Sequence, residues 1–193
     1  IHDAVFKDIY DFYIKSNESV FPKNYYDLSE QDKFEVLSNV KGALNPDDFE
    51  NEITRLTIES IQAIKVIQGN NGELGANRYI ISNNENALNV METFALIRLS
   101  DWENPTVDVV PLFESVDDLL NAHNVMEQLY TNPVYANHLV NREMKQTIML
   151  GFSDGTKDGG YLMANWSIYK AKEELTAISR KYGIKVIFFD GRG

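Results

Sequence analysis

Four short apolar runs that alternate with helical patterns constrain the fold of this chain most strongly. Each run is short and nearly continuous, which is typical of a strand buried on both faces of a sheet. The four runs are residues 78–82, 107–113, 147–151 and 184–189. This alternation predicts an α/β fold with a parallel sheet, either open or closed into a barrel. We expect two segments, a helical one over residues 1–75 and a strand-containing one over residues 76–193.

The pattern of the first segment predicts several helices. Ser29 stands where it can cap one helix, with an acidic residue three positions later. A longer helix is expected to begin at Asp47 or Asp48 and to end between residues 69 and 75. The residues expected on its inward face are Ile53, Leu56, Ile61, Ile64 and Ile67.

Composition excludes several classes of protein. The 193 residues include 29 acidic and 18 basic side chains, a net charge of −11, so we expect no nucleic acid and no anionic membrane as partner. The absence of cysteine excludes a disulfide scaffold, a zinc ribbon and a thiol nucleophile, and favours the cytoplasm. No apolar run approaches the length of a membrane span. The chain begins at Ile1 and stops at Gly193 within a glycine-rich stretch, so we expect it to be a piece of a larger protein.

Charged residues follow the ends of the predicted strands. Glu114 follows the second strand, Asp154 and Lys157 follow the third, and Arg192 follows the fourth. Because the carboxyl ends of parallel strands meet at one edge of a sheet, these side chains are expected to share one site. Two carboxylates suit a hard divalent cation, and the two cationic groups suit an anionic substrate held beside it.

Each of these residues also has a purely structural interpretation. Glu114 could be a favourable charge at the start of the next helix, and Asp154 could be a turn residue. Lys157 could be a solvated lysine at a helix start. The histidines do not follow strands and are not expected to be catalysts: His2, His123 and His138.

Three sequence motifs resemble signature segments of the phosphoenolpyruvate carboxylase family. Residues 148–160 are similar to the family's Met-hydrophobic-Gly-Tyr-Ser-Asp-Ser-x-Lys-Asp-x-Gly segment. Residues 110–119 are similar to its Pro-Leu-Phe-Glu-Thr-x-x-Asp-Leu segment, and residues 189–193 to its Phe-His-Gly-Arg-Gly-Gly run. In addition, Trp166 and residues 170–175 lie where the family has a Trp and an Ala-Gln-Glu helix.

This resemblance implies a fold and a reaction. The fold would be part of a (β/α)8 barrel of the phosphoenolpyruvate/pyruvate type, with about four of its strands in this chain. The reaction would convert phosphoenolpyruvate and bicarbonate to oxaloacetate and phosphate, with Mg²⁺ or Mn²⁺ as cofactor. The parent protein would be a homo-oligomer, a tetramer by resemblance to the family.

The resemblance also implies roles for individual residues. Glu114 and Asp154 match the two metal-ligand positions, and Lys157 matches an active-site lysine. Arg192 matches the first arginine of the substrate loop and is expected to act both in catalysis and in substrate binding. The remaining substrate-binding positions are Ser153 and Gly191.

The sequence departs from the family pattern at three positions of these motifs. Phe152 replaces Tyr, Gly155 replaces Ser, and Asp190 replaces His, which indicates a divergent branch. The Thr-Ala-His-Pro-Thr segment that carries the family's acid/base histidine does not occur in these residues. We therefore expect the 193-residue chain alone to have no carboxylase activity.

Other functions are compatible with the same residues. One is another divalent-metal-dependent enzyme of the phosphoenolpyruvate/pyruvate barrel type, and another is a non-catalytic assembly module derived from a barrel. A glycosidase could use Glu114 and Asp154 as its pair of carboxylates. Lys157 and Arg192 argue against the glycosidase, because neutral sugars offer these cations no partner.

Overall fold

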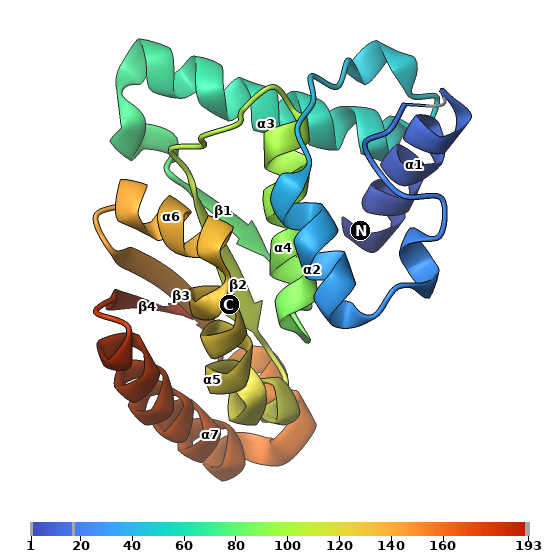
Figure 1. The fold of residues 1–193 in the computed structure, drawn as a ribbon. Coiled ribbons are helices and arrows are strands. Elements are labelled where there is room, and N and C mark those ends of the chain that lie inside the picture. The colour runs from blue at the N-terminus through green and yellow to red at the C-terminus, as the bar shows by residue number, and fades with distance from the viewer. Residues whose placement is uncertain (1, 17, 192–193) are drawn as a thin grey trace. The chain divides into compact units, whose positions relative to one another are not determined.

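The four apolar runs form one parallel sheet (Figure 1). The structure is a computed structural model that describes residues 2–16 and 18–191, except for the side chains of His2, Ser153, Asp154 and Asp158. The strands are β1 (Arg78–Ile81), β2 (Asp108–Phe113), β3 (Lys145–Gly151) and β4 (Lys185–Gly191). They lie in the order β1-β2-β3-β4, and each neighbouring pair is parallel. The predicted α/β class with a four-stranded parallel sheet is confirmed.

The chain divides into two compact units. One, which we call the helical unit, consists of Ile1–Asn77 and Met91–Val107. The other, the strand unit, consists of Arg78–Val90 and Asp108–Gly193. The helix α4 (Ala87–Leu99) begins in the strand unit and continues in the helical unit.

The two central strands differ from the two outer strands in burial. Nearly all side chains of β2 and β3 are buried, as the apolar runs predict. In contrast, Ile80 of β1 is 45% exposed and Phe189 of β4 is 53% exposed. The expectation that all four strands are buried on both faces is therefore wrong for β1 and β4, each of which has a neighbouring strand on one side only.

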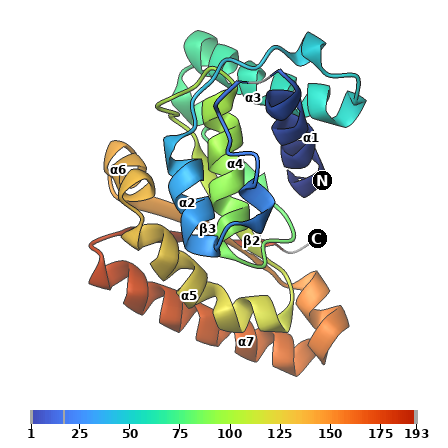
Figure 2. The same cartoon turned by 45° about the vertical axis from the view of Figure 1, so that its right-hand side comes forward.

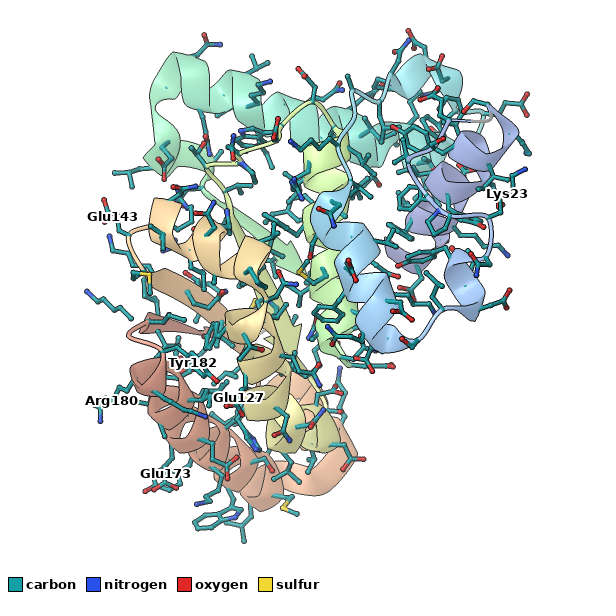
Figure 3. All side chains as sticks on the ribbon, in the orientation of Figure 1. Lys23, Glu127, Glu143, Glu173, Arg180 and Tyr182 are labelled. Atoms are coloured by element: carbon teal, nitrogen blue, oxygen red, sulfur yellow. The ribbon has the colours of Figure 1, made fainter. Side chains whose placement is uncertain are left out.

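Two long helices of the strand unit lie side by side against the sheet (Figures 1 and 2). They are α5 (Val116–Thr131) and α7 (Ser153–Lys181). Glu127 of α5 joins them at one end, where its Oε1 accepts hydrogen bonds from Lys181 Nζ at 2.6 Å and from Tyr182 Oη at 3.0 Å (Figure 3).

Two features of these helices are not in the predicted pattern. A separate helix, α6 (Pro133–Asn141), follows α5, because Asn132 Oδ1 accepts hydrogen bonds from the Val134 and Tyr135 amides and caps it. The helix α7 is also interrupted at Gly160, whose φ of 79° and ψ of 166° are not helical. A positive φ favours glycine, so Gly160 permits the change of direction there.

The helical unit contains three α-helices besides the larger part of α4, and short 3-10 turns, within its described residues. The helices are α1 (His2–Lys15), α2 (Glu30–Asn39) and α3 (Glu52–Asn71), and the turns are η1 (Tyr25–Asp27), η2 (Pro46–Asp48) and η3 (Glu73–Ala76). Aromatic rings form much of its core, with Phe6 and Phe21 packed edge to face at 5.5 Å between ring centres. Ser29 caps α2 as predicted, since its side chain accepts a hydrogen bond from the Asp32 amide at 3.2 Å.

The start and the inward face of α3 differ from the prediction. Asn51 caps this helix, and Asp47 and Asp48 lie instead in the preceding turn η2. Its buried residues are Thr54, Ile58 and Ile61, whereas Ile53, Leu56 and Ile67 are exposed. The prediction is thus confirmed for Ile61, and Ile64 is half-buried, but it is wrong for the three exposed residues. Because α3 has apolar residues around more than one face, periodicity alone did not select its buried stripe.

Candidate functional site

The carboxyl ends of β2 and β3 approach each other closely. Phe113, the last residue of β2, pairs with Leu150, the residue before Gly151. A Cβ placed on Gly151 would lie 3.1 Å from Glu114 Cα and 3.3 Å from the Phe113 carbonyl oxygen. A larger residue at position 151 would therefore have to displace the backbone around Glu114.

Glu114 lies between the end of β2 and the start of α5. The cap of α5 is formed by other residues, because Ser115 Oγ accepts from the Asp118 amide and Asp118 Oδ2 accepts from the Ser115 amide, both at 3.1 Å. Asp117 and Asp118 supply the acidic charge of the first helical turn. The side chain of Glu114 is partly buried at the carboxyl edge of the sheet.

The segment after β3 continues directly into α7. The Phe152 amide donates a hydrogen bond to the Gly191 carbonyl at 3.1 Å, and the Phe152 carbonyl accepts from the Thr156 amide at 3.0 Å. Ser153 and Asp154 begin α7, and their side chains lie outside the described residues. Lys157 lies in the first turns of α7 with an exposed side chain.

The end of β4 lies at the same edge. Gly151 and Gly191 are register partners, so β3 and β4 end at the same level of the sheet. Asp190 Oδ1 forms an ion pair with Lys172 Nζ of α7 at 2.7 Å. The motif-based prediction missed the contact between Lys172 and Asp190, because these two residues are far apart in sequence. Arg192 lies outside the described residues.

Buried polar groups lie at the opposite, amino-terminal end of β2 and β3. Arg142 Nε donates to Asp108 Oδ1 at 2.7 Å, and Tyr135 Oη donates to Gln146 Oε1 at 2.9 Å. Burial, together with the nearby Arg142, lowers the pKa of His138 to about 4. In parallel α/β folds this end of the sheet serves stability, and ligands bind at the other end.

The described residues contain no group of three or more His, Asp or Glu side chains arranged for a metal ion. The predicted pair includes Asp154, whose side chain is outside that description. Across the described helices, none is both long enough and apolar enough to cross a membrane.

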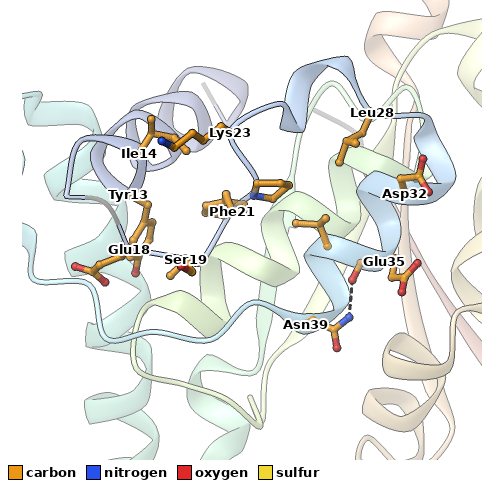
Figure 4. A pocket seen from close by; sticks show the side chains of 13 residues that line it. Tyr13, Ile14, Glu18, Ser19, Phe21, Lys23, Leu28, Asp32, Glu35 and Asn39 are labelled. Atoms are coloured by element: carbon orange, nitrogen blue, oxygen red, sulfur yellow. Dashed lines mark hydrogen bonds between the residues drawn. The ribbon is translucent and has the colours of Figure 1, made fainter.

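A pocket of about 790 Å³ opens in the helical unit (Figure 4). Tyr13 and Phe21 form part of its apolar lining, and Asp32 and Glu35 of α2 lie on one side of it. Burial raises the pKa of Tyr13 to about 12, with a further contribution from the negative charge of Glu18. None of the residues that line this pocket belongs to the three motifs.

Comparison with known proteins connects the whole chain with one family. The family model described as phosphoenolpyruvate carboxylase matches residues 2–193. Over 204 aligned residues, the chain is 32% identical to the phosphoenolpyruvate carboxylase of Nitrosomonas eutropha and 30% identical to that of Nitrosomonas europaea. Each alignment covers all of this chain and 21% of the relative, so the chain spans about a fifth of the length of these relatives.

Proposed function

Because this chain belongs to the phosphoenolpyruvate carboxylase family, we propose that it is the section of such an enzyme that holds the metal and phosphoenolpyruvate. The reaction joins phosphoenolpyruvate and bicarbonate to give oxaloacetate and phosphate. The four parallel strands would form about half of a (β/α)8 barrel, and the exposed edges of β1 and β4 are where further strands would pair.

The observation that carries this proposal is the convergence of the motifs at one edge of the sheet. Glu114 follows β2, and a Cβ at Gly151 of β3 would lie only 3.1 Å from Glu114 Cα. The Phe152 amide donates a hydrogen bond to the Gly191 carbonyl of β4. Residues from three separate sequence segments are thus brought to one place. Ligand sites of parallel α/β folds lie at this end of the strands.

The residues at this edge fit a hard divalent cation. Carboxylate oxygens are the ligands that Mg²⁺ and Mn²⁺ prefer, and Glu114 and Asp154 would supply them. When bound, the metal would neutralise negative charge that develops on the substrate oxygens. Glu114 is held for this role by its place between β2 and the capped start of α5.

The cationic and small residues would bind the anionic substrates. Arg192 offers a planar fork that matches a phosphate or a carboxylate, and Lys157 offers a second positive charge. Ser153 and Gly191 would approach the substrate with a hydroxyl and a backbone amide. Together these groups would hold phosphoenolpyruvate and the carboxyl donor at reacting distance.

The 193-residue chain alone would be inactive, because the family's acid/base histidine segment is not among its residues. The complete enzyme would be a homo-oligomer, a tetramer as the family resemblance implies. It would act in the cytoplasm.

The test uses the full-length protein that contains this chain. We expect Glu114→Gln and Asp154→Asn each to lower kcat by about 10²-fold or more, because each removes a metal ligand. Asp117→Asn is the matched control, since this carboxylate lies in the first turn of α5, three residues after Glu114. Electron paramagnetic resonance of bound Mn²⁺ gives a second readout that does not depend on turnover. Retention of Mn²⁺ affinity and kcat in both site variants would contradict the proposed site.

A further inference from the structure

The end of β4 carries a negative charge beside the proposed substrate site. Asp190 pairs in register with Leu150, one residue before the level at which Gly151 and Gly191 meet. It stands two positions before Arg192 in the sequence. A carboxylate at this place would repel an anionic substrate and would compete with it for cationic side chains.

Lys172 provides the compensating charge. Its Nζ lies 2.7 Å from Asp190 Oδ1 and 5.8 Å from the centre of the Phe188 ring. Phe188 and Asp190 are two residues apart on β4, so their side chains project from the same face of the strand. The lysine therefore reaches from α7 to both of these side chains and holds the carboxylate toward the helix.

The pair is partly shielded from water. The side chains of Lys172 and Asp190 are 35% and 37% exposed. The lysine ammonium group also lies over the Phe188 ring, a cation–π contact that limits its freedom. These contacts restrict the positions available to the Asp190 carboxylate.

Asp190 departs from the family pattern described above. The resembling segment has His where this chain has Asp190. Asp190 and Lys172 touch in the structure although they are separated in sequence. The carboxylate that replaces this His is thus held in an ion pair.

We propose that Lys172 is a positioning residue that holds the Asp190 carboxylate on the α7 side of β4 and so keeps its negative charge from the anionic substrate. This inference rests on the proposed function and extends it to a residue outside the three motifs. The substrate class concerned is a phosphorylated carboxylate. The effect falls on binding, because the lysine acts through Asp190 and does not contact the reacting atoms.

The experiment measures KM for phosphoenolpyruvate and kcat in the full-length protein. We expect Lys172→Gln to raise KM about fivefold to tenfold at low ionic strength, with kcat changed less than about twofold. The increase should shrink as salt is added. The double variant Lys172→Gln with Asp190→Asn should return KM to within about twofold of the wild type, because the repelling charge is removed with its partner.

Lys170→Gln is the matched control. Lys170 lies on the same helix as Lys172 and forms an ion pair with Glu173 at 2.6 Å. Glu173 belongs to α7 and not to β4, so this pair does not involve the strand. Its removal should leave KM unchanged. If Lys172→Gln behaves like Lys170→Gln, or if the double variant keeps the high KM, the inference is wrong while the proposed function stands. If the wild-type protein does not carboxylate phosphoenolpyruvate, the proposed function fails and the inference fails with it.

Discussion

The two units of this chain differ sharply in charge. The helical unit has 8 basic and 17 acidic residues, a net charge of −9, whereas the strand unit has 10 and 12, a net charge of −2. Counting the charged residues in the first and second halves of the sequence would hide this difference in net charge. The reason is that residues 91–107 belong to the helical unit. The motifs for an anionic substrate all lie in the unit that is nearly balanced. A strongly negative unit would repel such a substrate.

The units also differ in how they bury ionisable groups. In the strand unit, Asp108 and Arg142 form a buried ion pair. In the helical unit, Glu92 lies near aromatic rings and accepts a hydrogen bond from Tyr25 Oη at 3.4 Å. Burial, together with the charge of Asp3, raises the pKa of Glu92 to about 7. The strand unit thus buries a compensated pair, while the helical unit holds an acid that is stable there when protonated.

The largest expected effect comes from breaking the buried pair. The side chains of Arg142 and Asp108 are only 9% and 11% exposed, so Arg142→Met would leave a buried carboxylate without its cation. We expect a loss of about 3–5 kcal/mol in the free energy of unfolding, measured by urea denaturation. Lys41→Met is the control in the helical unit, because its ion pair with Glu103 is solvent-exposed and contributes little. If both variants lost the same free energy of unfolding, the two units would not differ in how much an ion pair stabilises them.

The next effect is a pH dependence in the helical unit. Folded Glu92 keeps its proton up to about pH 7, whereas the unfolded residue loses it near 4.5. Unfolding therefore releases a proton in this window, and the free energy of unfolding should fall by about 3 kcal/mol as pH rises from 4.5 to 7. Hydrogen-exchange protection of the α4 amides measures this fall in stability. The Glu92→Gln variant should not show it. If the stability of this variant still falls as pH rises from 4.5 to 7, a group other than Glu92 causes the pH dependence.

The strand unit should respond to pH in the opposite direction. Unfolded His138 binds a proton below about pH 6.5, whereas the folded residue does so only near pH 4. The free energy of unfolding should therefore fall by about 3 kcal/mol as pH decreases from 6.5 to 4. Hydrogen exchange of the α6 amides measures this fall in stability. The His138→Gln variant should not show it. Since the two windows overlap, the effects oppose each other, and a measurement on the whole chain would show less pH dependence than either unit.

Much of the strand unit could be predicted from sequence, because short apolar runs and the rule that parallel strands share a carboxyl edge are local and general. These rules located the strands and placed Glu114 and Gly151 at one edge. The helix α6 was missed although Asn132 and Pro133 are a cap and a first-turn residue, since the apolar pattern of α5 hides the break.

The features that could not be predicted depend on contacts between distant residues. The inward face of α3 is decided by what packs against it, not by its own spacing. The exposure of Ile80 and Phe189 depends on the order of strands in the sheet. The Lys172–Asp190 pair requires α7 to return along β4, which no single motif encodes.

The smallest expected effect compares a glycine from each unit. An alanine Cβ at position 151 would meet the backbone of Glu114 and Phe113 at 3.1 and 3.3 Å, whereas a Cβ at Gly69 of α3 would have nothing within 4 Å. We expect Gly151→Ala to reduce the free energy of unfolding by about 1–3 kcal/mol, because a backbone cannot yield as a flexible side chain does. Gly69→Ala should increase the free energy of unfolding by up to about 1 kcal/mol, because alanine favours the helix.

In the full-length protein, Gly151→Ala should also lower kcat, because it displaces Glu114. Gly69→Ala should leave kcat unchanged. If Gly151→Ala is as stable and as active as the wild type, the close approach of β2 and β3 does not hold Glu114 in place.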